Sequence, residues 1–381
     1  MYQVSRFGIK GFRRLFNVDL EIRPFMAVIG VNGSGKTSLL DAFSLLSASA
    51  EGNLSKKLSE LGGISNILTR GKSEEMEFSL EAKTLEESFL KYEIRLATQG
   101  AGHAVIYDTL RHYDDFCNEQ ILLIDSLDGV ACYRKLDRGE NYAVEDTFID
   151  SGETALSQVP KTFTHSELFR RILANTVKYQ PIDVGPRSYV RLPQQMNPTF
   201  DPGMNGEDLL PFLYNIRETS QDKFEIITDT MRAAFPDFKE FGFPPVAAGM
   251  LTMTWKDSNF TRPLYINELS DGTLRFLWLA SLLQSPTLPS IMMIDEPDIS
   301  LHPQQMNLLV DLMREASGRT RLVIATHSDR IVRFVKPEEL MVFDIDEEGG
   351  TSAMYADSFD LEKWLSKYRL DELWSMGHLT L

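Results

Sequence analysis

The amino-acid sequence predicts an α/β fold with a mostly parallel core sheet, an antiparallel β meander and a helical lobe. Three observations lead to this expectation. Short apolar strands alternate with helices near both ends of the chain, which is typical of a parallel sheet with crossover helices. Segments of alternating polarity fill residues 75–149 and indicate antiparallel strands. Residues 164–180 and 206–234 have helical periodicity instead.

The elements follow one another along the chain in this order. Strands are expected at residues 2–12, 18–22 and 25–30, followed by a helix at about 35–50, the meander and the two helical segments. A Pro- and Gly-rich stretch between the helical segments, residues 179–203, is interpreted as ordered loop. The remaining elements are an apolar helix after LSDGT, a strand at 291–297, a helix at 304–316, and strands at 321–328 and 339–345.

These elements predict one domain over residues 1–381, organised in four parts. Residues 1–75 and 286–381 form the core lobe, and an antiparallel insertion at 75–160 and a helical lobe at 160–285 lie between them. An amphipathic helix with Trp364, Leu365, Leu370, Leu373 and Trp374 on its apolar side ends the chain. It is expected to pack on its own domain rather than detach as a docking peptide.

Composition limits the classes of partner. The formal net charge is −16, which argues against sequence-independent DNA binding by the whole surface and leaves open a local basic groove. No apolar run approaches the ~20 residues of a membrane-spanning helix, and the first residues lack the apolar core of a signal peptide. The two cysteines, Cys117 and Cys132, fit a reducing compartment. We therefore expect a soluble, cytoplasmic protein with no membrane partner.

A phosphate-binding loop is the strongest motif. GVNGSGKT, from Gly30 to Thr37, satisfies G-x-x-x-x-G-K-[ST] between an apolar strand and a helix, the context that a P-loop NTPase requires. Its glycines let backbone amides surround a phosphate, and Lys36 adds a positive charge for the terminal phosphates. The hydroxyl of Thr37 is a predicted Mg²⁺ ligand. The predicted ATP-binding residues of this loop are Asn32, Gly33, Ser34, Gly35, Lys36, Thr37 and Ser38.

Two further strands end in polar residues. IMMIDEP ends in Asp295, a predicted Mg²⁺ ligand, and Glu296, a predicted general base for an attacking water. RLVIATHS ends in Thr326, His327 and Ser328, and His327 is expected to contact the γ-phosphate or that water. Ligands bind at the carboxyl ends of strands in open α/β sheets, and this position favours catalytic roles for Glu296, His327 and Lys36.

The sequence LSDGT opens a helix more than two hundred residues after the phosphate loop. Ser270 stands at or just before that helix, Asp271 begins it, and Gly272 permits close backbone approach. A simple helix cap is one interpretation of these residues and a second phosphate contact is another, and the two are compatible.

In this order, the motifs resemble those of the ATP-binding cassette (ABC) ATPases, and within them the RecF and SMC branch. The resemblance is closest to compact ATPases of bacterial anti-phage and DNA-maintenance genes. It is carried by FGIKGFRRLFNVDLEI, GVNGSGKTSLLDAF, NELSDGTLRFLWLASLL, IMMIDEPDISLHP and IATHSDRIV, which leave only the middle of the chain without a motif.

The resemblance implies a homodimer joined head to tail by ATP. Ser270, Asp271 and Gly272 would bind the γ-phosphate held by the other subunit, and Asp298 resembles the residue that communicates across the dimer. The signature reads LSDGT instead of LSGGQ, a form found in the RecF-like branch. The glutamine of the Q-loop is not securely placed, with Gln180 as one candidate and Gln158 as a weaker one.

Phe12 and several arginines are open to more than one interpretation. Phe12, Arg13 or Arg14 could touch the nucleotide or form a solvated strand edge. Arg187 and Arg191 are candidates for contact with a nucleic acid or a partner, with surface salt bridges as the alternative role. Arg275 is a candidate for coupling nucleotide state to the neighbouring lobe.

The sequence leaves two functions to weigh. The first is an ATP-hydrolysing switch in anti-phage defence or DNA maintenance that controls a separate effector, a nuclease or toxin, or acts on DNA. The second is a scaffold for such an effector that holds ATP with little turnover. A transporter ATPase is disfavoured by the RecF-like signature.

Overall fold

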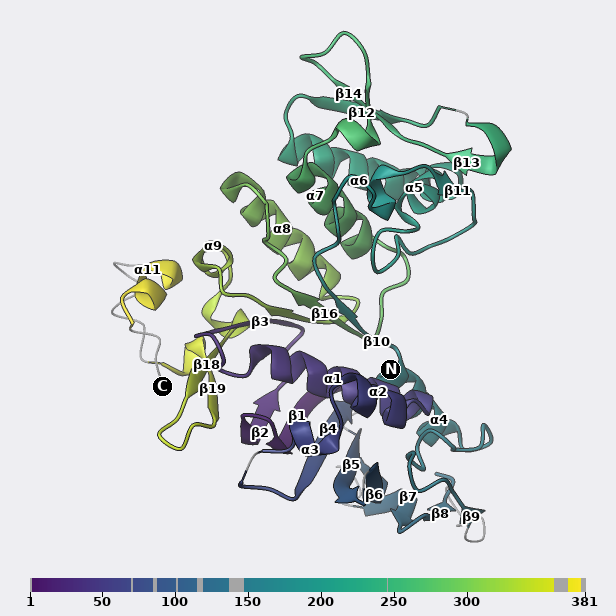
Figure 1. Ribbon diagram of the computed structural model, residues 1–381, viewed down its shortest axis with the longest axis vertical. Coiled ribbons are helices and arrows are strands. Elements are labelled where there is room, and N and C mark those ends of the chain that lie inside the picture. Colours follow the sequence, from purple (N-terminus) through teal and green to yellow (C-terminus); the bar gives the residue numbers. More distant parts are fainter. Residues whose placement is uncertain are drawn as a thin grey trace.

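The computed structural model describes residues 2–69, 71–84, 88–100, 102–114, 119–136, 147–244, 246–359 and 369–377 (Figure 1). A six-stranded sheet crosses the middle of the molecule. Below it in Figure 1 lies a lobe with an eight-stranded antiparallel sheet, and above it lies a mainly helical lobe with two small sheets. The strands that precede the phosphate loop, the acidic pair and His327 belong to the middle sheet.

The eight-stranded sheet is larger than the predicted meander. The antiparallel meander is confirmed, but the first two strands of the chain also join it, because β1 pairs with β4. The predicted boundary at residue 75 therefore cuts through a continuous sheet, and the four-part division of the chain stays a prediction. The strands, in sequence order, are β1 (Gln3–Phe12), β2 (Leu15–Glu21), β4 (Glu75–Lys83), β5 (Ser88–Gln99), β6 (Gly102–Asp114), β7 (Glu119–Leu127), β8 (Val130–Tyr133) and β9 (Thr147–Phe148).

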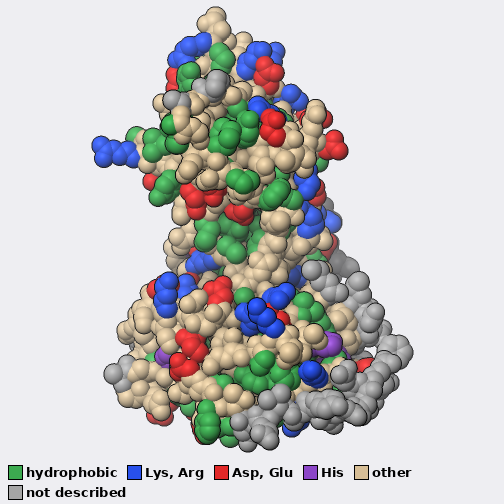
Figure 2. Space-filling view, turned by 90° about the vertical axis from the view of Figure 1, so that its right-hand side faces the viewer, with side chains coloured by type: hydrophobic (Ala, Val, Ile, Leu, Met, Phe, Trp, Pro, Cys, Tyr) green, Lys and Arg blue, Asp and Glu red, His purple; other side chains and the backbone are tan. Residues whose placement is uncertain are grey.

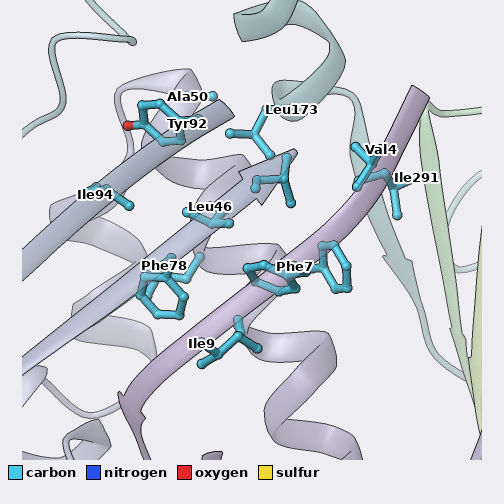
Figure 3. Close-up of a cluster of buried hydrophobic side chains, with 14 of the residues drawn as sticks. Val4, Phe7, Ile9, Leu46, Ala50, Phe78, Tyr92, Ile94, Leu173 and Ile291 are labelled. Carbon is cyan, nitrogen blue, oxygen red and sulfur yellow. The ribbon is translucent and has the colours of Figure 1, made fainter. Parts of the chain in front are cut away.

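Helix α1 (Lys36–Glu51) lies between the two large sheets (Figure 1). Phe7 on β1 packs against Phe43 with ring centroids 4.3 Å apart, and Phe78 on β4 continues this cluster (Figure 3). A helix with apolar residues on most sides is stable only when it is covered on most sides. These contacts hold α1 in position beneath the middle sheet.

The middle sheet has the strand order β10-β16-β17-β3-β18-β19. Its first five strands pair in parallel, and only β19 runs antiparallel to its neighbour. The expectation of a mostly parallel sheet therefore describes this sheet alone, since most strands of the molecule pair antiparallel. The strands are β3 (Phe25–Gly30), β10 (Thr176–Tyr179), β16 (Ile291–Asp295), β17 (Arg321–Ala325), β18 (Leu340–Ile345) and β19 (Thr351–Tyr355).

Three predictions of secondary structure were wrong. The helix expected at residues 164–180 ends at Ala174, and its last residues form β10 because they pair with β16. The helix expected at 206–234 is two helices that meet at Ser220, whose backbone angles, φ −151° and ψ 68°, are not helical. Strand β19 follows the strand that was expected to be the last.

The upper lobe packs α5 (Leu209–Thr219) and α6 (Gln221–Ala234) against α7 (Asp271–Leu283). Its core includes the fully buried side chains of Trp278 and Phe276. The remaining elements of this region are β11 (Gln194–Gln195), β12 (Phe238–Gly242), β13 (Met250–Leu251), β14 (Thr254–Asp257), β15 (Leu264–Tyr265), η1 (Tyr189–Arg191), η2 (Ala247–Gly249) and η3 (Ile266–Glu268).

The last described helix packs on a helix that follows strand β17 of the middle sheet. Helix α11 (Leu370–Ser375) contacts α9 (Asp329–Val332) and buries Leu370 and Leu373, so this part of the C-terminal helix packs on its own domain. Trp364, Leu365 and Cys117 lie outside the described residues. In the part of the chain that the structure describes, no helix is both long enough and apolar enough to cross a membrane. The remaining helices are α2 (Leu54–Glu60), α3 (Ile64–Ile67), α4 (Thr164–Ala174), α8 (Pro303–Ala316), η4 (Pro337–Glu339) and η5 (Ala356–Ser358).

Candidate functional site

The phosphate loop joins the fully buried strand β3 to the start of α1. Gly33 has φ +80°, and nothing lies within 4 Å of the position that a Cβ would take there. Gly35 precedes the helix with φ +107°, a conformation that disfavours other residues. The loop is therefore open over Gly33, where a ligand can approach the backbone.

Lys36 is buried and turns back over its own loop. Its Nζ donates to the carbonyl oxygens of Gly30 at 2.7 Å and Val31 at 3.0 Å. Burial lowers the pKa of Lys36 to about 8, while the charges of Glu296 and Asp295 oppose that shift. The ammonium group thus has hydrogen bonds to carbonyls but is held close to the acidic residues of the site.

The other residues of the loop differ in exposure. Asn32 and Thr37 are exposed and Ser38 is partly exposed, so their side chains can reach a ligand. Ser34 is buried, and its Oγ has no hydrogen-bond partner in the described structure. A buried hydroxyl without a partner is costly and is often satisfied by a ligand.

The hairpin of β18 and β19 supports the loop from the side. The hydroxyl of Thr351 donates to the carbonyl oxygen of Ser34 at 2.7 Å. The Thr351 backbone amide donates to the carbonyl oxygen of Arg14 at 2.9 Å. A Cβ on Gly35 would stand 2.5 Å from the Thr351 hydroxyl oxygen. Loop and hairpin are therefore packed in direct contact.

The acidic strand end lies two strands away from the phosphate loop in the same sheet. Asp295 is in register with Ala325 on β17, and Ala325 is in register with Val28 on β3. Burial raises the pKa of Asp295, and Lys178 is the charge that opposes this shift most strongly. The predicted residues Lys36, Asp295, Glu296 and His327 are thus brought together at one edge.

Glu296 has a left-handed backbone with φ +46°, an unusual conformation for this residue type that is common at functional sites. Its backbone amide donates to the carbonyl oxygen of Ala325 at 2.8 Å. Its carboxylate accepts from the Thr326 hydroxyl at 3.3 Å and lies 3.6 Å from Nε2 of His327. Burial raises the pKa of Glu296, and the His327 backbone amide and side chain oppose this shift.

Thr326 connects Glu296 with the turn that follows it. Its hydroxyl oxygen also lies 2.8 Å from Oδ1 of Asp298, to which it donates. Thr326 is fully buried, and sequence analysis did not single it out. Its position between Ala325 and His327 was the only available signal.

Two further charged residues at this edge were also missed. Nζ of Lys178 on β10 lies 2.9 Å from Oδ1 of Asp41 on α1 and 3.9 Å from Oδ2 of Asp295. Arg13 lies 2.6 Å from the other oxygen of Asp41. Lys178 and Asp41 are 137 positions apart in the chain, and no local pattern links them.

The structure corrects the placement of Gln180. Sequence analysis found no convincing strand end there, but Gln180 directly follows β10, whose last residue Tyr179 is in register with Ile294 on β16. The exposed Gln180 therefore lies at the same edge as Asp295. Gln158 instead hydrogen-bonds within residues 150–158 of the lower lobe.

The signature residues lie on a different surface. Ser270 caps α7 by accepting from the Thr273 amide at 3.1 Å, as the simple-cap interpretation predicts. Ser270 and Asp271 are exposed, and with Gly272 they line an open hollow of about 510 Å³. No described residue of the phosphate loop lines that hollow, which is completed by Phe235, Thr273, Ser300, His302 and Gln305.

The signature helix touches the loop that follows the acidic strand. A Cβ on Gly272 would stand 2.6 Å from the carbonyl oxygen of Ser300. Arg275 donates to the Ser300 hydroxyl and, at 3.4 Å, to the carbonyl of Ile182. The prediction that Arg275 couples nucleotide state to the neighbouring lobe stays a prediction, and these contacts are compatible with it.

Arg191 is not an exposed docking residue. Its side chain is 10% exposed and donates to the carbonyls of Val184, Asn267 and Leu269 at 2.6 to 3.0 Å, and to Asp271 at 2.6 Å. The guanidinium therefore holds the signature loop, because its donors face inward. Arg187, by contrast, is exposed.

The three candidate residues at positions 12–14 differ in burial and in their contacts. Phe12 is fully buried and packs against Phe78, so it cannot contact a nucleotide. Arg13 pairs with Asp41, and Arg14 is exposed.

The donor set suits magnesium carried by a nucleotide. The described residues contain no group of three or more His, Cys, Asp or Glu side chains that could hold a metal alone. Mg²⁺ commonly takes only one or two protein ligands together with phosphates and water. The exposed hydroxyl of Thr37, the carboxylate of Asp295 and the unpartnered Ser34 hydroxyl fit such a nucleotide complex.

Comparison with known proteins identifies the family. The sequence profile of the family described as "AAA domain, putative AbiEii toxin, Type IV TA system" matches residues 25–333. No curated protein matches the chain. Two solved structures are similar: an SMC head bound to the C-winged helix domain of ScpA, and an SMC head with an extended coiled coil bound to the C-terminal domain of ScpA from Pyrococcus furiosus.

Both matches extend over nearly the whole of each chain. The first has a TM-score of 0.57 at 14% identity and covers 93% of this chain and 99% of the SMC head. The second has a TM-score of 0.52 at 14% identity and covers 96% and 98%. The chain belongs to the family of AAA domains whose profile it matches, and its fold is that of the SMC heads, the ABC-type ATPase fold that its motifs predict.

Proposed function

We propose that this protein is an ATPase that uses ATP and Mg²⁺ to close two copies of itself head to tail. The observation that carries the proposal is the separation of its two phosphate-binding motifs. Ser270, Asp271 and Gly272 line a hollow to which no described residue of the phosphate loop contributes. A second copy could supply the missing half of each site.

The phosphate loop would hold the nucleotide through its backbone amides and Lys36. The ammonium group of Lys36 would exchange the carbonyls of Gly30 and Val31 for phosphate oxygens, which are stronger acceptors. When bound, magnesium would neutralise phosphate charge, with Thr37 and Asp295 as its protein ligands.

Glu296 would act as the general base for the attacking water. Its raised pKa makes the carboxylate a better proton acceptor than an exposed glutamate. Thr326 and the His327 amide hold one carboxylate oxygen, leaving the other oriented toward the His327 ring. His327 would contact the γ-phosphate or the same water.

ATP turnover would control a separate effector, a nuclease or toxin, or act on DNA, in anti-phage defence or DNA maintenance. Exposed apolar side chains on the upper lobe support a protein partner; they are Tyr189, Leu192, Met196, Phe200 and Met204. Figure 2 shows hydrophobic side chains at several places on this lobe. SMC heads of the same fold bind ScpA domains, according to the structures described above.

Glu296→Gln tests both hydrolysis and dimerisation. It should retain ATP binding and lose about 10²- to 10⁴-fold in turnover, because a general base is removed while the side chain keeps its shape. The variant should accumulate as a dimer with ATP and Mg²⁺, measured by light scattering. His103→Gln, a substitution in the lower lobe, serves as the control and should keep wild-type turnover.

A Glu296→Gln protein that binds ATP but stays monomeric at saturating ATP would contradict head-to-tail closure. Phosphate release by the wild-type protein, measured with and without DNA, separates the switch from an ATP-bound scaffold. Release no faster than that of Glu296→Gln would favour the scaffold.

A further inference from the structure

Lys178 is a cation placed between two carboxylates at the edge of the nucleotide site. Its side chain is 14% exposed, and its Nζ lies 2.9 Å from Asp41 and 3.9 Å from Asp295. Asp41 and Asp295 have similarly small exposed fractions, 15% and 19%. Charges in such positions are weakly screened by solvent, so their interactions are stronger than those of surface pairs.

Asp41 draws the lysine away from Asp295. Both carboxylates are within reach of one ammonium group, but the shorter distance is to Asp41. Arg13 occupies the second oxygen of Asp41 at 2.6 Å. Each oxygen of Asp41 therefore has its own cation, while Asp295 shares Lys178 and remains available to another cation.

We infer that Lys178 is a positioning residue that competes with magnesium for Asp295, and that Asp41 limits this competition by holding Lys178. This inference rests on the proposed function, in which Asp295 is a ligand of the nucleotide's magnesium. Lys178 thereby sets how much magnesium the protein needs to bind ATP tightly.

The alternative role for a lysine at this edge is a direct contact with phosphate. The two roles predict opposite results when the charge is removed. A phosphate-binding lysine strengthens nucleotide binding, so its loss weakens affinity. A lysine that competes with magnesium weakens binding of the magnesium complex, so its loss strengthens affinity.

Lys178→Met keeps much of the side-chain volume and removes the charge. Its affinity for N-methylanthraniloyl-ATP should rise on the order of 10-fold at limiting free Mg²⁺, because one positive charge near Asp295 is lost. In EDTA its affinity should not rise. Lys57→Met is the matched control, because Lys57 lines the same open groove as Asp41 and Lys178 but pairs with Glu60. It should leave both affinities unchanged.

Asp41→Asn supplies a second, independent direction. It releases Lys178 toward Asp295, so affinity at limiting Mg²⁺ should fall, although the same ion pair is broken as in Lys178→Met. A merely structural ion pair would move both variants in the same direction. In the double variant, Asp41→Asn should add little to Lys178→Met, because no lysine remains to be released.

Weaker binding by Lys178→Met at limiting Mg²⁺ would overturn the inference in favour of a phosphate contact. Affinities equal to those of the wild type and Lys57→Met would overturn it as well. A wild-type protein that binds no nucleotide in either buffer would instead contradict the proposed function, so the two failures are distinguishable.

Discussion

The phosphate loop and the signature loop bring small and polar residues to the surface in two different ways. The phosphate loop is open over Gly33, holds a buried Ser34 hydroxyl without a partner in the described structure, and turns Lys36 back on its own carbonyls. In the signature loop, Arg191 donates to the Leu269 carbonyl and to Asp271, and the Ser270 hydroxyl caps the helix.

The difference indicates which loop has groups left for a ligand. The phosphate loop has unused or weakly used donors that an anion can satisfy. The signature loop is fixed by contacts within the chain, so that Ser270 and Asp271 are presented outward without a ligand. Loss of a side-chain contact should therefore affect mainly folding at the signature loop and mainly nucleotide binding at the phosphate loop.

Arg191→Ala should have the largest effect on this comparison. It removes one side chain that pairs with three carbonyls and Asp271, and the free energy of unfolding should fall by about 2–4 kcal/mol. Nucleotide binding by the phosphate loop should persist. Urea denaturation and binding of a fluorescent ATP analogue measure the two effects.

Arg187→Ala is the control for this variant, because Arg187 is an exposed arginine in the same region. It should change the unfolding free energy by less than about 0.5 kcal/mol. Equal stabilities of the two variants would show that Arg191 does not hold the signature loop.

A smaller effect is expected for Gly272→Ala. The added Cβ would meet the Ser300 carbonyl at 2.6 Å, so the unfolding free energy should fall by about 1–3 kcal/mol despite the better helix propensity of alanine. Gly33→Ala has open space and only a strained backbone, and should cost about 1–2 kcal/mol.

Thermal or urea unfolding of Gly272→Ala, alone and combined with Ser300→Gly, tests whether the contact with Ser300 causes the loss of stability. Ser300→Gly frees the left-handed backbone at this position and also removes the hydroxyl that accepts from Arg275, so the double variant is compared with Ser300→Gly alone. The cost of Gly272→Ala should be smaller in that background, which is the recovery expected. No recovery would show that the contact with the Ser300 carbonyl is rigid, and a Gly272→Ala protein of wild-type stability would disprove the close packing.

The smallest effect is expected from pH. Burial lowers the pKa of Lys36 to about 8, and only the charged ammonium attracts phosphate. Nucleotide affinity should therefore be nearly constant below pH 8 and fall by up to about 10-fold for each unit above it. The measurement is a series of binding titrations from pH 7 to pH 9, where a flat profile would contradict the role of Lys36.

Local patterns in the sequence were enough to place the motifs. The phosphate loop, Asp295 and Glu296 follow apolar strands, and LSDGT begins a helix, so neighbouring residues carry the signal. Strand β10 was missed because four residues after a helix become a strand only by pairing with β16, which lies more than one hundred positions later.

The contacts of Lys178 and Arg191 could not be predicted for the same reason. Lys178 meets Asp41 across 137 positions, and Arg191 meets Asp271 across 80. Within their own segments, Lys178 and Arg191 both look like surface residues, because charged residues in loops and at strand ends are usually exposed. Their roles arise only when the middle sheet and the upper lobe are assembled.

The hydrogen bond from Thr351 to the Ser34 carbonyl has a practical consequence for shortening the chain. Every sequence motif lies before residue 333, where the family profile ends. A shortened protein that stops there would keep all of these motifs but lose the hairpin whose threonine braces the loop. We therefore expect the smallest nucleotide-binding unit to include this hairpin and to extend past the last recognisable signature.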